Sequence, residues 1–247
     1  MIDLRGTAVL VTGASGGVGS GIARRFAAAG AAVVAHYHRD RVSAEELVGS
    51  LGVRAVALGA DLAMEAECLR LVEEAAGWAG RLDALVNCAG VQPDQALAGM
   101  SLADWRAVVD VNVASVFACT QAAAGIMARQ GGGSVTHVAS IQAHAPAEGH
   151  AHYCASKAAV VMHARSAALE YGRVGVRVNS VSPGLVDREG LDWEEGVRRW
   201  REVVPLGELV PASAVGDVCV FLASPMAAFV TGQDVCVDGG MTARPPW

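Results

Sequence analysis

The segment HYCASK, residues 152–157, places a phenol and an ammonium four positions apart with small side chains between them. Four residues make about one helical turn, so on a helix Tyr153 and Lys157 would be neighbours on one face. The positive charge of Lys157 would favour the phenolate and lower the pKa of Tyr153 from its free value of about 10. The pair could then act as a general acid/base. An ordinary helix start, with a core tyrosine and a solvated lysine, has the same spacing.

A second candidate for chemistry is the glycine-rich segment TGASGGVG at residues 12–19, between an apolar run and a helical pattern. Gly13, Gly17 and Gly19 permit a tight turn and a close approach of backbone N–H groups to a pyrophosphate. The positive end of the helix dipole would add to that attraction. Position 22 is isoleucine, so the strict GxGxxG fingerprint fails. The segment indicates a dinucleotide site, with a plain turn as the alternative.

The rest of the chain alternates short apolar runs with longer alanine-rich helical segments. Several apolar runs are continuous, which is typical of parallel strands covered on both faces. Regular alternation with right-handed crossovers predicts a doubly wound sheet. We expect strands at 7–12, 32–37, 54–58, 84–87, 134–139, 176–181 and 234–237, and helices at 17–29, 42–51, 65–78, 101–130, 151–171 and 212–223.

These elements predict an α/β fold: a single-domain, Rossmann-type, doubly wound parallel sheet of about seven strands with helices on both faces. No linker or repeat divides the chain, so residues 1–247 are expected to form one domain. Residues 183–209 do not follow the alternation of strands and helices, and long connections of this kind are often lids. Within them Trp193, Val197, Trp200 and Val204 follow helical spacing. This predicts a short amphipathic helix that either docks on the body or walls a substrate pocket.

Composition narrows the class of protein. Hydrophobic residues make up 53% of the chain and charged residues 18%, which favours a large core over disorder. The net charge is −6 without a basic cluster, which argues against nucleic-acid partners and anionic membrane surfaces. We see no secretory start and no apolar run of about 18 residues. The six cysteines form no C-x-x-C pair. We expect a cytoplasmic protein with mostly buried, reduced thiols and no membrane span.

Together the motifs resemble the short-chain dehydrogenase/reductase family. The resemblance rests on the glycine segment, NCAG at 87–90, Ser140 and the Tyr153/Lys157 pair, in order and at family-like spacing. RVNSVSPG at 177–184 and TGQDVCVDGG at 231–240 extend it over residues 7 to 240. It implies an NAD(P)-dependent oxidoreductase that interconverts a secondary alcohol and a ketone. A developing alkoxide on the substrate needs a positioned O–H donor and a proton source, which agrees with these residue types.

The resemblance assigns four catalytic roles. Tyr153 would be the general acid/base, and Lys157 would lower its pKa and hold the nicotinamide ribose. Ser140 would hydrogen-bond the substrate oxygen, and Asn112 would hold a water that links Lys157 to solvent. The expected cofactor contacts are Gly13, Ser15, Gly17, Val18, Gly19, Tyr37, His38, Arg39, Asp61, Leu62, Asn87, Ala89, Gly90, Tyr153, Lys157, Pro183, Gly184 and Val186.

The choice between NAD and NADP depends on the end of the second strand, where a carboxylate would bind the ribose 2′-OH. That position holds Tyr37, followed by His38 and Arg39, and Asp40 comes later. The missing carboxylate and the nearby arginine favour NADP, with NAD possible. Gly16 stands where many family members carry an arginine for the 2′-phosphate, which weakens that preference.

The expected substrate contacts are Ser140, Gln142, His150, Tyr153 and Trp193. The polar loop groups Gln142, His144 and His150 favour a sugar, a polyol or another small hydroxylated ketone. A 3-oxoacyl (thioester or polyketide) reductase is the alternative, and a non-catalytic dinucleotide sensor is the rival from another class.

We expect no metal site. His144, Glu148, His150 and His152 cluster before Tyr153, but they read better as pocket lining and solvated loop. Two departures from the family pattern are Cys88, in place of an asparagine, and Arg188, in place of a threonine that meets the nicotinamide carboxamide.

Assembly as a homotetramer is expected from the family's habit of pairing the helices that carry Asn112 and Tyr153. Residues 101–130 and 151–171 are apolar around most of their circumference, which agrees with burial on more than one side. The tail at 243–247 ends in Trp247, which a neighbouring subunit could bury.

Overall fold

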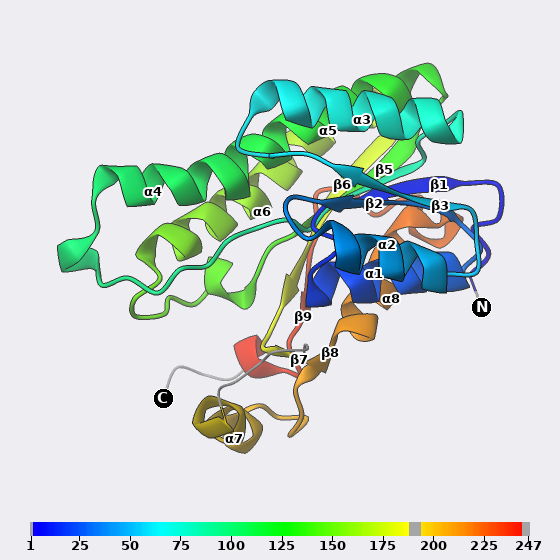
Figure 1. The fold of residues 1–247 in the computed structure, drawn as a ribbon. Coiled ribbons are helices and arrows are strands. Elements are labelled where there is room, and N and C mark those ends of the chain that lie inside the picture. Colours follow the sequence, from blue (N-terminus) through cyan, green and yellow to red (C-terminus); the bar gives the residue numbers. More distant parts are fainter. Residues whose placement is uncertain (1, 188–193, 244–247) are drawn as a thin grey trace.

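The computed structural model describes residues 2–187 and 194–243 of the chain. Seven parallel strands form its central sheet in the order β3-β2-β1-β4-β5-β6-β9 (Figure 1). The strands are β1 (Ala8–Val11), β2 (Ala32–Tyr37), β3 (Ala55–Gly59), β4 (Ala84–Asn87), β5 (Gly133–Val138), β6 (Val176–Pro183) and β9 (Asp234–Val237). The predicted α/β architecture is confirmed, and β2, β4 and β9 have the predicted bounds.

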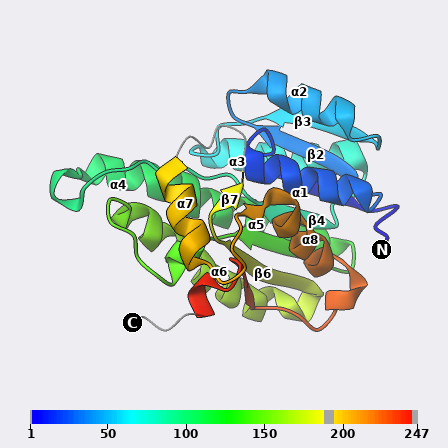
Figure 2. The same ribbon diagram turned by 90° about the horizontal axis from the view of Figure 1, so that it is seen from below.

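Helices cover both faces of this sheet. One face carries α1 (Gly17–Ala28), α2 (Arg41–Ser50) and α8 (Ala212–Ala223), and the other carries α3 (Glu65–Ala79), α5 (Ser115–Arg129) and α6 (Ala151–Tyr171) (Figures 1 and 2). Successive residues of β1 divide between the two layers: Val9 and Val11 pack in the core with Phe26, whereas Leu10 packs with Leu71 and Met127. This explains why the strand is apolar without alternation.

The predicted helix at 101–130 is one long helix with a defect in the middle. Ser101 and Asp104 form a capping box that starts α4 (Leu102–Val109), and a π turn, η2 (Asp110–Ala114), joins it to α5. Leu102–Arg129 spans 28 residues with a mean hydropathy of 1.5, so by length and composition alone it could cross a membrane. Half of its most apolar window is buried, as in core helices that meet the same criterion. The expectation of no membrane span therefore stays a prediction.

The segment that departs from regular alternation has its own small structure. Two short parallel strands, β7 (Val186–Asp187) and β8 (Val210–Pro211), flank α7 (Glu194–Val203) beyond the carboxyl ends of β6 and β9 (Figure 1). The predicted amphipathic helix is present: Val204, just after it, is buried and Trp200 is half-buried. Trp193 lies outside the described residues, as does Arg188.

The remaining elements are five short 3-10 turns, η1 (Leu97–Gly99), η3 (Ile141–Ala143), η4 (Gly172–Val174), η5 (Pro225–Ala227) and η6 (Met241–Ala243). All six cysteines are free. Cys68, Cys119 and Cys219 are buried, Cys88 and Cys154 are partly buried, and Cys236 is exposed. The expectation of mostly buried thiols therefore fails for Cys236, because it lies on the edge strand β9.

Candidate active site

Tyr153 and Lys157 lie one turn apart near the start of α6, as their spacing indicated. The Lys157 Nζ is 5.6 Å from the centre of the Tyr153 ring and donates to the Val138 carbonyl at 2.8 Å. Lys157 is buried, and this burial lowers its pKa to about 8. An ammonium is thus held beside the phenol by a carbonyl at the end of β5.

Asn112 lies in the π turn and is fully buried. Its Oδ1 accepts from the Val91 N–H at 2.8 Å, and its Nδ2 donates to the Val91 carbonyl and the Ser156 hydroxyl, both at 3.0 Å. A Cβ on Gly90 would lie 3.2 Å from the Asn112 Oδ1 and 3.5 Å from the Lys157 Nζ. Asn112, Lys157 and the Gly90 backbone therefore meet at one point, and π turns are frequent at functional sites.

Ser140 follows β5 and begins the turn η3, where its hydroxyl accepts from the Gln142 N–H at 3.1 Å. Gln142 Oε1 accepts a weak hydrogen bond from the thiol of Cys154, the residue after Tyr153. The His150 ring meets the Tyr153 ring edge-on, with 6.4 Å between centres. Ser140, Gln142 and His150 thus lie around the start of α6.

The histidines before Tyr153 do not converge. His144 directs Nε2 to the Asp234 Oδ2 at 2.7 Å, and His150 uses Nδ1 for the carbonyl two residues earlier. His152 is buried, and its Nδ1 accepts from the Tyr153 N–H. The His150 ring lies against the Tyr153 ring, whereas His144 pairs with Asp234; that these histidines line the substrate pocket stays a prediction.

The glycine-rich turn brings backbone groups close together. Gly13 has a φ of +66°, and a Cβ there would lie 2.9 Å from the Ala89 Cα. A Cβ on Gly19 would lie 2.2 Å from the Gly13 carbonyl oxygen. Helix α1 begins at Gly17, its N-cap Gly16 provides no side-chain cap, and its first turn carries no acidic residue. The positive end of α1 is thus open to a pyrophosphate. Ser15 and Val18 lie half-buried on the same turn.

Sequence reasoning missed two residues that hold this turn. The buried His36, on β2, accepts from the Gly13 N–H at 3.0 Å through Nδ1 and contacts a carbonyl just after β3 through Nε2. Burial lowers its pKa to about 4, so the ring is neutral. The Thr12 hydroxyl accepts from the N–H groups of Cys88 and Ala89 at 2.9 and 3.0 Å. The signal in the sequence that could have identified them is a polar residue within or at the end of an apolar strand.

The expected adenosine end lies where β2 and β3 stop. β2 ends at Tyr37, whose ring rests against Gly59. The His38 Nε2 is 3.8 Å from the Asp61 Oδ2. Asp40 caps α2: its Oδ1 accepts from the Ser43 N–H at 3.0 Å. Arg39 is exposed, and Leu62 is buried beside Asp61.

The remaining predicted cofactor residues lie at the ends of β4 and β6. The Asn87 side chain is buried, and its Nδ2 donates to Thr120 and His137, both at 3.2 Å. Gly184 lies against the Trp200 ring: a Cβ there would be 2.8 Å from Cζ2. The buried Trp200 Nε1 has no hydrogen-bond partner within residues 2–187 and 194–243. Pro183 ends β6, and Val186 is buried in β7.

Fold and site together define an α/β oxidoreductase of the dinucleotide-binding type, with its functional groups at the carboxyl ends of the strands. The chain belongs to the short-chain dehydrogenase/reductase family. A family model described as enoyl-(acyl carrier protein) reductase matches residues 13–242. The resemblance read from the motifs is confirmed.

Relatives that are named for different activities match nearly the whole chain. It is 36% identical to 3beta-hydroxysteroid dehydrogenase 1 of Eggerthella lenta, covering 98% of this chain and 96% of that one. It is 36% identical to a 3-oxoacyl-[acyl-carrier-protein] reductase of Synechocystis, covering 98% and 99%. A solved short-chain type dehydrogenase/reductase from Mycobacterium ulcerans superposes with a TM-score of 0.92 at 31% identity, covering 98% and 92%.

Proposed function

We propose that this oxidoreductase interconverts a secondary alcohol and a ketone, with Tyr153 as the general acid/base. The observation that carries the proposal is the buried Lys157 ammonium beside the Tyr153 ring. The ammonium favours the phenolate over the phenol, which suits Tyr153 to act as a general acid/base.

A nicotinamide dinucleotide would supply or accept the hydride when bound. The glycine-rich turn would hold its pyrophosphate, and Asp61 and Leu62 would lie near its adenine. The Ser140 hydroxyl would donate to the substrate oxygen and steady its developing charge. The Tyr153 Oη would give its proton to that oxygen in reduction and take it back in oxidation. Lys157 would hold the nicotinamide ribose, and Asn112 would hold the water that reconnects Lys157 to solvent.

NADP is the favoured cofactor, with NAD as the alternative. Two observations support this preference: β2 ends in Tyr37 rather than a carboxylate, and Asp40 is engaged as the cap of α2. The exposed Arg39 is available for a 2′-phosphate.

For the substrate we favour a sugar, a polyol or another small hydroxylated ketone. The polar groups Gln142 and His150 beside Tyr153 support it. A relative 34% identical over 98% of this chain is glucose 1-dehydrogenase 2 of Bacillus subtilis. Reduction of 3-oxoacyl thioesters is the second candidate, supported by the relative of that name.

Tyr153→Phe tests the proposal directly. Removing the hydroxyl should lower kcat by at least ~10²-fold, the usual scale for losing a general acid/base, while the dissociation constant of the dinucleotide stays nearly unchanged. The substrate is first found by following NADPH, NADH and NAD(P)⁺ turnover against sugars, polyols, 3-oxo thioesters and cyclic ketones. An unchanged kcat in the variant would remove Tyr153 from this role.

We also propose that the enzyme works as a homotetramer in the cytoplasm, without nucleic-acid or membrane partners. Supporting the tetramer, Phe117, Met162 and Leu169 are exposed on α5 and α6. The negative net charge supports the absence of nucleic-acid and membrane partners.

A further inference from the structure

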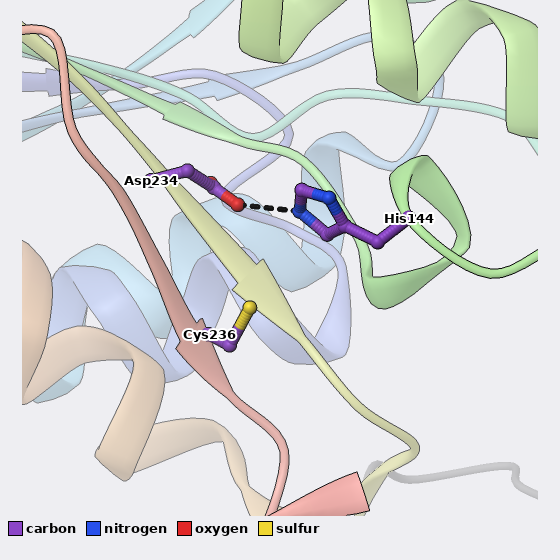
Figure 3. Close-up of side chains that lie close together, drawn as sticks. All are labelled: His144, Asp234 and Cys236. Carbon is purple, nitrogen blue, oxygen red and sulfur yellow. Dashed lines mark hydrogen bonds and ion pairs between the residues drawn. The ribbon is translucent and has the colours of Figure 1, made fainter. Parts of the chain in front are cut away.

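Three side chains of metal-binding type meet beside the edge strand β9. His144 comes from the segment after η3, and Asp234 and Cys236 come from β9 (Figure 3). Their potential ligand atoms all lie within 4.8 Å of one another. From this cluster we infer a zinc site with the His144 imidazole, the Asp234 carboxylate and the Cys236 thiolate as protein ligands.

The local structure explains why the three groups share one space. Asp234 and Cys236 are two residues apart on a strand, so their side chains project from the same face. In register with them on β6 stand Ser180 and Ser182. His144 reaches this face from the segment after Ser140 and brings Nε2 to 2.7 Å from the Asp234 Oδ2.

The carboxylate is already fixed in orientation. The Asp234 side chain is only 5% exposed, and its Oδ1 accepts from the hydroxyls of Ser180 at 2.6 Å and Ser182 at 3.0 Å. Its Oδ2 accepts from Ser182 at 2.9 Å and faces His144. Hydrogen bonds of this kind orient metal ligands and strengthen their binding.

The donor set selects the ion. One nitrogen, one oxygen and one sulfur ligand suit Zn²⁺, whereas Mg²⁺ and Ca²⁺ prefer oxygen ligands alone. Tetrahedral Zn²⁺ separates a nitrogen and an oxygen ligand by roughly 3.3 Å, so His144 and Asp234 need to move apart by less than ~1 Å. Water would complete the fourth position.

Binding would also release a proton. A free cysteine thiol has a pKa of about 8.5, so without the ion Cys236 carries its proton at neutral pH. Zn²⁺ forms its bond to the sulfur as the S–H proton leaves to solvent, and no electron transfer is involved.

Occupancy would tie the segment after Ser140 to β9, because His144 is four residues after that serine. The plain alternative is a hydrogen bond between His144 and Asp234 to which Cys236 contributes nothing. The zinc site and this alternative differ in whether the Cys236 sulfur contributes to metal binding.

The test uses full-length protein without a polyhistidine tag, stripped with a chelator and titrated with Zn²⁺ by calorimetry. We expect one ion per chain and release of about one proton. Cys236→Ser and His144→Gln should each weaken binding at least ~10²-fold, and Ser182→Ala about 10-fold. Cys154→Ser, which removes a partly buried thiol elsewhere, should bind like the wild type, and Mg²⁺ should not compete. Equal affinity in wild type and Cys236→Ser would overturn the site.

Three measurements on the wild type avoid dependence on variant folding. Co²⁺ in place of Zn²⁺ should give a sulfur-to-metal charge-transfer band. Zn²⁺ should also protect Cys236 from alkylation, read by peptide mass spectrometry, with Cys154 as internal reference. Absence of the band and unchanged alkylation of Cys236 would contradict the proposal. Saturating Zn²⁺, at about 100 times its dissociation constant, should raise the melting temperature by roughly 5 °C.

Discussion

At the level of a single residue, we expect Tyr37 to influence the choice between NAD and NADP. Its ring rests on Gly59 at the end of β2, where a carboxylate would accept hydrogen bonds from a ribose 2′-OH and repel a 2′-phosphate. Tyr37→Asp should shift preference towards NAD by roughly 10-fold or more, the scale of one charged interaction. The measurement is the ratio of kcat/KM for NADPH and NADH. No shift, or a shift towards NADP, would place the 2′-phosphate elsewhere.

The buried imidazole ring of His137 is expected to contribute to the pH dependence of folding stability. It is fully buried between Asn87 and His163, with contacts of 3.2 and 3.1 Å. Burial lowers its pKa to about 3, and the charges of His163 and Lys157 act in the same direction. The folded ring therefore stays neutral while the unfolded ring, with a pKa of about 6.5, gains a proton as pH falls below neutral. Stability carried by this neutral ring is thus present above the unfolded pKa and is lost as pH falls.

His137→Asn should remove that contribution to the pH dependence. Between pH 7 and pH 5 the wild type should lose about 2 kcal/mol more free energy of unfolding than the variant, from linkage at one site. Urea denaturation at the two pH values measures it. Parallel losses in the two proteins would show that the ring does not titrate between the folded and unfolded states.

Residue types and spacing were enough to nominate the main chemical groups. Tyr153 and Lys157 are one helical turn apart in any helix, so their proximity could be predicted without the fold. His36 and Thr12 could not be nominated in that way, because each acts on backbone groups far along the chain. The separation of His144 from His150 was equally hidden, since Asp234 lies 90 residues away.

At the scale of elements, the junction of β1 and α1 is the proposed phosphate site. A Cβ on Gly19 would come within 2.2 Å of the Gly13 carbonyl oxygen, a backbone atom that can yield only if the turn moves. Gly19→Ala should therefore weaken dinucleotide binding at least ~10-fold, because the N–H groups of α1 would no longer align on the pyrophosphate. Fluorescence titration with NADPH measures it, and near-wild-type affinity would contradict this reading.

Gly77→Ala provides the matched control for that variant. Gly77 is exposed within α3, and a Cβ there meets nothing within 4 Å. The change should leave dinucleotide affinity unaltered and stabilise the fold by about 0.5–1 kcal/mol, as expected for alanine in a helix interior.

Periodicity located the long elements well because a buried parallel strand and an amphipathic helix each repeat a simple pattern. The two-residue strands β7 and β8 were not predicted, since so short a pairing carries no period of its own. The π turn at Asp110–Ala114 was also missed, because it interrupts a helix without any change in composition. The 3-10 turns were not predicted for the same reason. That one domain spans the whole chain, with an insertion at 183–209, stays a prediction.

At the scale of the whole molecule, the sheet places the candidate site residues at the carboxyl ends of its strands. It leaves the outer surfaces of α5 and α6 uncovered. The sheet can bury only one side of these helices. Phe117 is 50% exposed, Met162 59% and Leu169 83%, all on this layer. Exposed apolar side chains that gather into one patch are typical of an interface, and we propose that these three belong to one.

We therefore expect light scattering at micromolar concentration to give four times the chain mass of 25.3 kDa. Closed twofold symmetry would make each interface self-complementary, so one substitution acts twice at the same contact. Phe117→Asp combined with Leu169→Asp should thus reduce the mass, because two carboxylates would be buried without partners on both sides. Val42→Asp is the control: Val42 is 65% exposed on α2, away from this layer, and the change should leave the assembly intact. A wild-type chain that is monomeric and fully active would show that these helices need no partner.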